Sequence, residues 1–155
     1  MEKNQLSLTL LTNEELMEQV KTLAARERQA TTQLIASLAE LDARGLYLGE
    51  GFSSLFTYCT QCLHLSEHAA YSRIAAARAA RKLPAVLERL ADGSITLTTI
   101  VLVAPHLTSE NHQEVLDAAK HRSRREVERQ VAALRPLPPV ATIVRKLPID
   151  RKSVV

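Results

Sequence analysis

The sequence predicts an all-α fold, arranged as one compact domain of six or seven helices. Alanine, the strongest helix former, occurs 21 times among 155 residues, whereas there are only four glycines and no tryptophan. Hydrophobic residues make up 46% and charged residues 24% of the chain, which is typical of globular proteins that bury a core. This composition argues against a β-sandwich and against a glycine-rich nucleotide-binding fold.

Composition divides the chain into three parts. We expect residues 1–12 to form a flexible N-terminus, residues 13–135 the helical domain, and residues 136–155 an extended, proline-rich basic tail. Prolines at the start of this tail prevent the last helix from continuing. Because the tail has no core of its own, we expect one domain of a longer protein or a truncated gene product.

The first predicted helix runs from residue 13 to about Arg44. Thr12 and Glu15 have the spacing of a capping box at its start, and Gly45 is suited to end it.

Apolar residues on this long helix follow a heptad. Leu16 and Leu23 lie on one row and Leu34 and Leu41 on the other, with Glu27 as a charged interruption. The stripe predicts either a dimer interface built on these four leucines or packing of the helix across the core of its own domain.

The other predicted helices span residues 53–63, 66–82, 84–92, 96–104, 109–120 and 123–134. Gly49 and Gly51 bracket a loop before the first of them. Ser66 is a good N-cap, and Ser123 with Glu126 forms a second capping box. The apolar, β-branched run over 96–104 is interpreted as a buried helix, because the sequence offers no partner strands.

Charge is distributed unevenly along the chain. With histidine neutral, residues 1–50 carry a net charge of −3, residues 51–112 of +1 and residues 113–155 of +5. The basic C-terminal third fits either a polyanionic partner or a solvated helix face followed by a basic tail.

The segments 53–63 and 67–82, with a turn at residues 64–66, have the order of a helix-turn-helix. Polar and basic residues on the second helix would then meet bases and phosphates, and the last helix would add a second basic surface. The candidate DNA-binding residues are His68, Tyr71, Arg73, Arg78, Arg81, Lys82, Arg124 and Arg125. The alternative is an ordinary antiparallel helix pair with a solvated arginine face.

Cys59, Cys62, His64 and His68 form a candidate metal site, because Cys-x2-Cys is a common zinc half-site. Both cysteines, however, fall on one predicted apolar helix. The same residues are also interpreted as two small hydrophobic residues and two partly exposed histidines. We expect no bound metal and no cofactor.

Other catalytic patterns are weak. His106, Asn111 and His112 are nuclease-like residue types, but a ββα-metal nuclease needs a hairpin, and no hairpin signal is present. The sequence has no glycine-rich phosphate loop, Gly-x-Ser-x-Gly or His-Glu-x-x-His motif. We therefore expect neither catalysis by this chain alone nor a small-molecule substrate.

Location is also predicted from the sequence. No apolar run approaches the roughly 18 residues of a membrane helix, and the first residues do not have the pattern of a secretory signal. Two cysteines do not make a disulfide framework. We expect a cytoplasmic protein without a membrane partner.

Several segments together resemble the N-terminal helical domain of bacterial HNH endonuclease-like proteins. These segments are LAELDARGLY at 38–47, GFSSLFTYC at 51–59, LSEHAAYSRI at 65–74, APHLTSENH at 104–112, SRREVE at 123–128 and RKLP at 145–148. The resemblance covers about residues 20–148. In such proteins the nuclease is a separate C-terminal metal-binding module, and this sequence contains no counterpart of its catalytic residues.

The resemblance implies an accessory domain for target binding or assembly. Our leading hypothesis is a non-catalytic module that binds double-stranded DNA. The alternative is a protein-interaction or dimerisation domain built on the long N-terminal helix.

Overall fold

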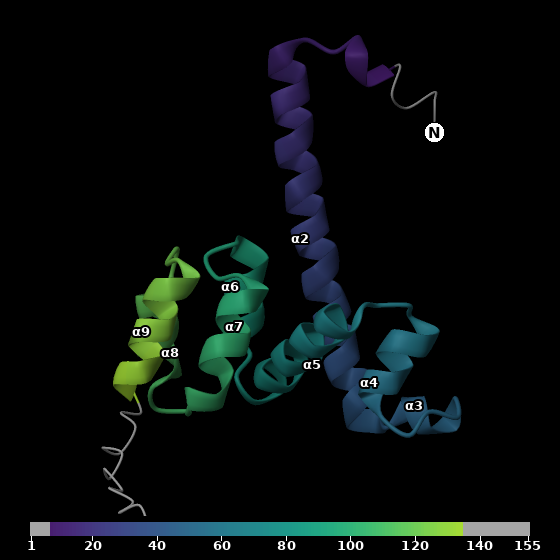
Figure 1. The fold of residues 1–155 in the computed structure, drawn as a ribbon, viewed down its shortest axis with the longest axis vertical. Coiled ribbons are helices and arrows are strands. Elements are labelled where there is room, and N and C mark those ends of the chain that lie inside the picture. The colour runs from purple at the N-terminus through teal and green to yellow at the C-terminus, as the bar shows by residue number, and fades with distance from the viewer. Residues whose placement is uncertain (1–6, 135–155) are drawn as a thin grey trace, which may run out of the picture.

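The structure is a computed structural model that describes residues 7–134, and all regular secondary structure in this part is helical (Figure 1). The expected all-α class is confirmed, because these residues contain helices and no strands. None of the helices described is long and apolar enough to cross a membrane. The proline-rich tail predicted for residues 136–155 lies outside the described residues.

Seven predicted helices have counterparts, and two short helical segments were not predicted: residues 7–9, within the predicted flexible N-terminus, and residues 46–49. The elements are α2 (Asn13–Arg44), α3 (Leu46–Gly49), α4 (Leu55–Thr57), the π-helical turn η1 (Tyr58–Cys62), α5 (Glu67–Lys82), α6 (Ala85–Asp92), α7 (Leu97–Val103), the 3-10 turn η2 (Ala104–His106), α8 (His112–Ala119) and α9 (Arg124–Leu134). Helix α3 follows Gly45 directly and ends at Gly49, where the predicted loop begins. The predicted helix over 53–63 is divided into α4 and η1.

Both predicted capping boxes are present. Glu15 N donates to Thr12 Oγ1 at 3.2 Å, and Thr12 N donates to a Glu15 carboxylate oxygen at 3.4 Å. At the start of α9, Ser123 N donates to Glu126 Oε2 at 2.9 Å, and Glu126 N donates to Ser123 Oγ at 3.3 Å. Gly45 ends α2 at φ 62°, a left-handed conformation that glycine adopts without a steric penalty.

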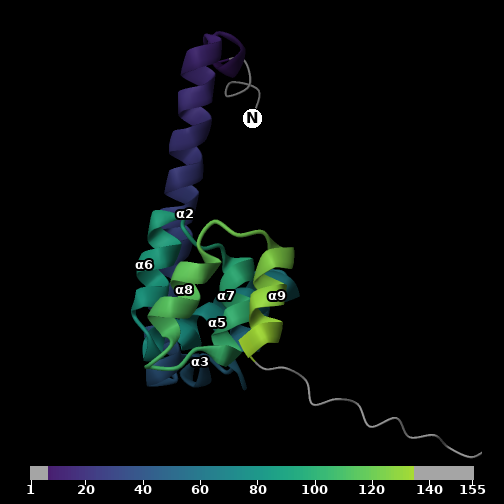
Figure 2. The same cartoon turned by 90° about the vertical axis from the view of Figure 1, so that its left-hand side faces the viewer.

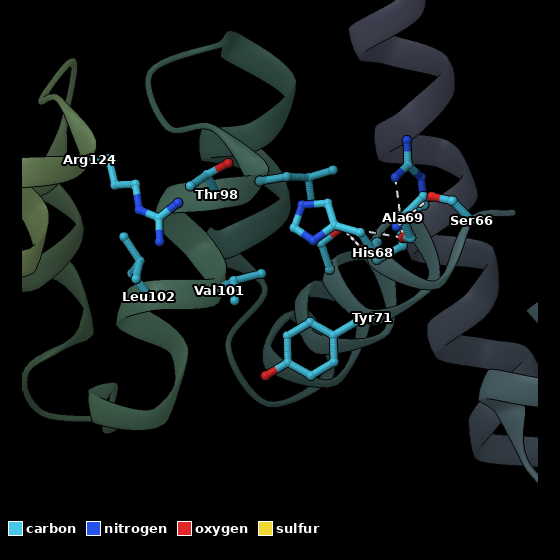
Figure 3. A pocket seen from close by; sticks show the side chains of 11 residues that line it. Ser66, His68, Ala69, Tyr71, Thr98, Val101, Leu102 and Arg124 are labelled. Carbon is cyan, nitrogen blue, oxygen red and sulfur yellow. Dashed lines mark hydrogen bonds between the residues drawn. The ribbon is translucent and has the colours of Figure 1, made fainter.

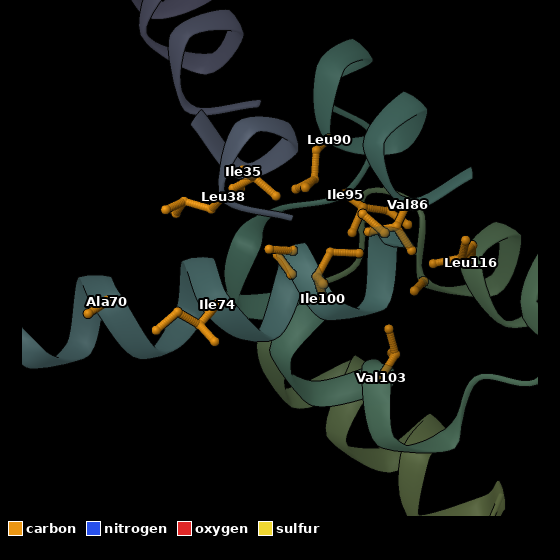
Figure 4. Close-up of a cluster of buried hydrophobic side chains, with 14 of the residues drawn as sticks. Ile35, Leu38, Ala70, Ile74, Val86, Leu90, Ile95, Ile100, Val103 and Leu116 are labelled. Carbon is orange, nitrogen blue, oxygen red and sulfur yellow. The ribbon is translucent and has the colours of Figure 1, made fainter. Parts of the chain in front are cut away.

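The core lies where the second half of α2 meets α5, α6 and α7, with α8 and α9 closing the far side (Figure 4). Helix α5 is central, because it packs against α2, α4, α6 and α7. Its buried alanines allow the neighbouring helices to approach closely. The largest fully buried side chains are those of Ile35, Leu38, Leu55, Ile100, Leu116, Val86, Val103, Val127 and Cys59.

Helix α2 has two halves with different surroundings. Its second half contributes Ile35 and Leu38 to the core, and Leu34 and Leu41 pack against that core. Its beginning, up to about residue 23, stands clear of the other helices in both views (Figures 1 and 2). Every residue from 12 to 24 is exposed. Contacts of α2 with the rest of the domain therefore begin at about residues 24–28.

Candidate nucleic-acid interface

A groove of about 350 Å³ lies between the start of α5, helix α7 and the start of α9 (Figure 3). It is lined by Ser66, His68, Ala69, Tyr71, Ser72, Arg73, Leu97, Thr98, Val101, Leu102 and Arg124. The groove therefore brings together predicted DNA-binding residues from two separate helices. His68, Tyr71 and Arg73 come from α5, and Arg124 comes from α9.

Local hydrogen bonds position the α5 side of this groove. Ser66 caps the helix, because its Oγ accepts a hydrogen bond from Ala69 N at 3.1 Å. Ser72 Oγ donates to the carbonyl oxygen of His68 at 3.0 Å. Just before the cap, His64 adopts φ 57°, which lets the chain turn sharply from η1 into α5.

Arg73 lines this groove and also a second one between α2, α6 and α7, and it carries an unsatisfied donor. Its Nη1 donates to the carbonyl oxygen of Ala69 at 3.2 Å, one turn earlier in α5. Its Nε is buried and has no hydrogen-bond partner within residues 7–134. A buried donor without a partner costs free energy, and an anionic oxygen would satisfy it with a charge-assisted hydrogen bond.

Arg124 supplies the second guanidinium from the opposite side (Figure 3). Its Nε lies 2.9 Å from Glu128 Oε1, and the two side chains are 70% and 48% exposed. An exposed pair of this kind contributes little free energy, so Arg124 can exchange it for another anion at small cost. Arg125 is also exposed, but it does not line the groove.

The remaining cations predicted on α5 lie toward its other end. Arg78 Nε donates to Asp42 Oδ2 of α2 at 3.3 Å. Arg81 and Lys82 are exposed in the last turn, without an acidic partner in the described part of the chain. At about 100° per residue, Arg78 and Lys82 share the side of α5 that carries Tyr71, whereas Arg73 lies nearly opposite. The predicted recognition helix thus divides its cations between two surfaces.

The four candidate zinc ligands differ in their surroundings. Cys59 is fully buried on η1, whereas Cys62, His64 and His68 are exposed. Burial raises the pKa of the Cys59 thiol, which favours the protonated form over the thiolate that binds metal. Within residues 7–134, no three His, Cys, Asp or Glu side chains form a group that could hold a metal ion.

The histidine-rich segment before α8 has a structural explanation. Asn111 Oδ1 accepts a hydrogen bond from Thr108 N at 2.7 Å, and Asn111 Nδ2 donates to the carbonyl oxygen of His106 at 3.0 Å. These bonds form the turn that leads into α8. The turn delays the start of the helix to His112, three residues later than predicted.

Sequence reasoning missed the α7 side of the groove. Thr98, Val101 and Leu102 line it, although their segment was predicted only as a buried helix. Part of the signal was present in the sequence. Thr98 is a polar residue in a largely apolar run, and it is exposed, which marks the side of α7 that faces away from the core.

Comparisons with protein-family models, curated proteins and solved structures find no match to this chain. The resemblance to HNH endonuclease-like proteins therefore has no support beyond the sequence segments that suggested it. Functional interpretation depends instead on the groove and the side chains around it.

Proposed function

We propose that this domain is a non-catalytic module that binds double-stranded DNA through the groove between α5, α7 and α9. One observation carries the proposal: Arg73 and Arg124, 51 residues apart in the sequence, line the same groove. Phosphate oxygens are acceptors that match arginine donors, and phosphate contacts dominate the affinity of most DNA-binding proteins. As the resemblance implies, such a module would position a nuclease that lies elsewhere in a longer protein.

Each side chain has a distinct task in this proposal. The guanidinium of Arg73 reorients to donate to a phosphate oxygen at the groove, which satisfies its unpartnered Nε, and Arg124 turns from Glu128 to the same strand. Tyr71, which is 60% exposed, offers its hydroxyl and ring to the sugar at the rim. Because phosphate and sugar contacts carry no direct sequence information, the domain binds with weak sequence preference.

Cations at the far end of α5 lie outside the groove. The helix has 16 residues, which corresponds to about 24 Å at 1.5 Å per residue. Arg81 and Lys82 lie in its last turn and are exposed. Lys82 lies on the side of α5 that carries Tyr71, so a duplex that rests on Tyr71 at the rim and runs along that side would also meet Lys82.

Fluorescence anisotropy of a labelled random duplex, titrated across a salt series, tests this site. Arg124→Gln should weaken binding severalfold and reduce the salt slope by about one, the value of one lost phosphate contact. Arg44→Gln is the matched control. Like Arg124, Arg44 is an exposed arginine paired with a glutamate four residues away on its own helix, but it lies at the end of α2, away from the groove.

Equal loss of affinity in the two variants would contradict the assignment of the groove. A single-stranded oligonucleotide of the same length serves as a second comparison. If it binds more tightly than the duplex, the proposal of a duplex-binding module is wrong.

A further inference from the structure

A second surface, unrelated to the groove, lies on the first half of α2. Four large apolar side chains are exposed there: Leu16 is 41%, Met17 60%, Val20 58% and Leu23 50% exposed. We call these four residues the free stripe. Scattered exposed apolar residues are common on proteins, but four of them on consecutive turns of one helix form a patch that needs an explanation.

The free stripe continues the face by which α2 packs onto its own domain. Taking Val20 as the reference and about 100° per residue, Leu16, Leu23, Ile35 and Leu38 all lie within about 60° of it. Ile35 and Leu38 are buried in the core. One helix face is therefore covered by this domain over its second half and uncovered over its first.

We propose that a second copy of this chain covers the free stripe, with the first halves of two α2 helices packed antiparallel. In this arrangement the two Val20 side chains lie near the two-fold axis. Leu16 of each copy then lies beside Leu23 of the other. A self-complementary patch of this kind is what a two-fold symmetric dimer requires.

Charge along α2 favours the antiparallel orientation. Glu14, Glu15 and Glu18 make the beginning of the helix acidic, whereas Lys21, Arg26 and Arg28 make the following turns basic. An antiparallel pair places the acidic end of each copy beside the basic turns of the other. A parallel pair would place like charges side by side.

The position of Glu27 also favours the antiparallel orientation. It occupies the same heptad row as Val20, one heptad later, so a parallel pair in register would bring two Glu27 carboxylates together at the seam. Antiparallel pairing about Val20 instead places Glu27 opposite Asn13 of the other copy, at the end of the contact.

The junction of α2 with α6 also limits how far the α2 helices of the two copies can overlap. Arg28 Nε donates to the carbonyl oxygen of Ala91 at 3.3 Å, which ties α2 to the end of α6. A second groove, of about 360 Å³, lies at this junction, with Ala24 and Glu27 on one side and Thr96 on the other. Pairing about Val20 brings the first turn of the other copy's α2 to this groove, which sets the register.

The overlap is short, about three helical turns, so the interface falls at or below the lower end of the roughly 1,200–2,000 Å² typical of stable complexes. We therefore expect reversible association at micromolar concentrations.

Sedimentation velocity of the full chain at about 1–100 µM measures this association. The parent should shift from monomer to dimer with concentration, and Leu23→Glu should remove the shift. The matched control is Thr22→Glu, which places the same charge on the neighbouring exposed residue, on the side of the helix away from the stripe. Circular dichroism of each variant monitors the helix content. The proposal would be overturned if the parent stayed monomeric at 100 µM, or if both variants lost dimer formation equally.

Disulfide formation tests the orientation, in a Cys62→Ser background that removes the exposed native thiol. Leu16→Cys and Leu23→Cys proteins, mixed and oxidised, should form a cross-linked heterodimer, whereas each alone should cross-link poorly. Efficient self-cross-linking of Leu16→Cys alone would show a parallel pair and overturn the antiparallel arrangement. Neither experiment involves DNA, so their outcome is independent of the proposed function.

Discussion

His64 and His121 hold left-handed backbone conformations, with φ of 57° and 55°, that residues other than glycine adopt infrequently. Each lies in a connection where the chain reverses direction over few residues. His64 precedes α5 and so helps to set where the groove begins. Sequence patterns place a turn at residues 64–66, but they do not show that a histidine accepts the position glycine usually takes.

Replacement of His64 should reveal this backbone strain. His64→Gly should be more stable than His64→Ala by about 1 kcal/mol, because both variants lose the imidazole and only glycine is free of the left-handed penalty. Urea unfolding of the two variants measures the difference. Equal midpoints would show that the turn is not strained.

Asp92 predicts a pH dependence of stability. Hydrogen bonds from Ser94, through its hydroxyl and its backbone N–H, lower the pKa of Asp92 below its ordinary value of 3.8. A carboxyl group with a lowered pKa stabilises the fold above its unfolded-state pKa, and this contribution disappears as the pH falls through the folded-state pKa. Acidification below about pH 4 should therefore destabilise the parent more than Asp92→Asn, as measured by urea midpoints. If acidification lowered the urea midpoint of both proteins equally, the prediction for Asp92 would be wrong.

At the scale of elements, the sequence predicts helices well where a cap and a periodic pattern coincide. The bounds of α2 are matched at both ends, because the capping box at Thr12 and the glycine at Gly45 mark them. Helix α3 was missed because four residues are too few to show a helical period. The heptad of α2 identifies its apolar face, but no pattern states which half of that face its own domain covers.

The two halves of α2 should therefore respond differently to the same substitution. Leu38→Ala, in the buried half, should lower the free energy of unfolding by about 2–5 kcal/mol, because it leaves a cavity in the core. Leu23→Ala, on the exposed half, should change it by about 0.5 kcal/mol or less. Chemical denaturation below about 1 µM protein makes the comparison, since dilution suppresses self-association. If both substitutions lowered the free energy of unfolding by similar amounts, the first half of α2 would have to be packed against the domain in solution.

At the scale of the whole molecule, the candidate site depends on tertiary structure. The sequence identified His68, Tyr71, Arg73 and Arg124 as residues suited to DNA, but it assigned Arg124 to a separate surface. Their meeting around one groove results from the packing of α7 between α5 and α9, which no local pattern encodes. By contrast, the spacing of Arg73 and Arg78 on a predicted helix is enough to place them on different sides of α5, at about 100° per residue.

The salt dependence of duplex binding tests the central claim most directly, with the native protein compared with the double variant Arg73→Gln/Arg124→Gln. If both arginines contact phosphates, the slope of log affinity against log salt should fall by about two in the double variant, at roughly 0.9 per contact. Arg44→Gln should leave the slope unchanged. An unchanged slope in the double variant, or no binding by the native protein at low salt, would contradict the claim that the groove binds DNA.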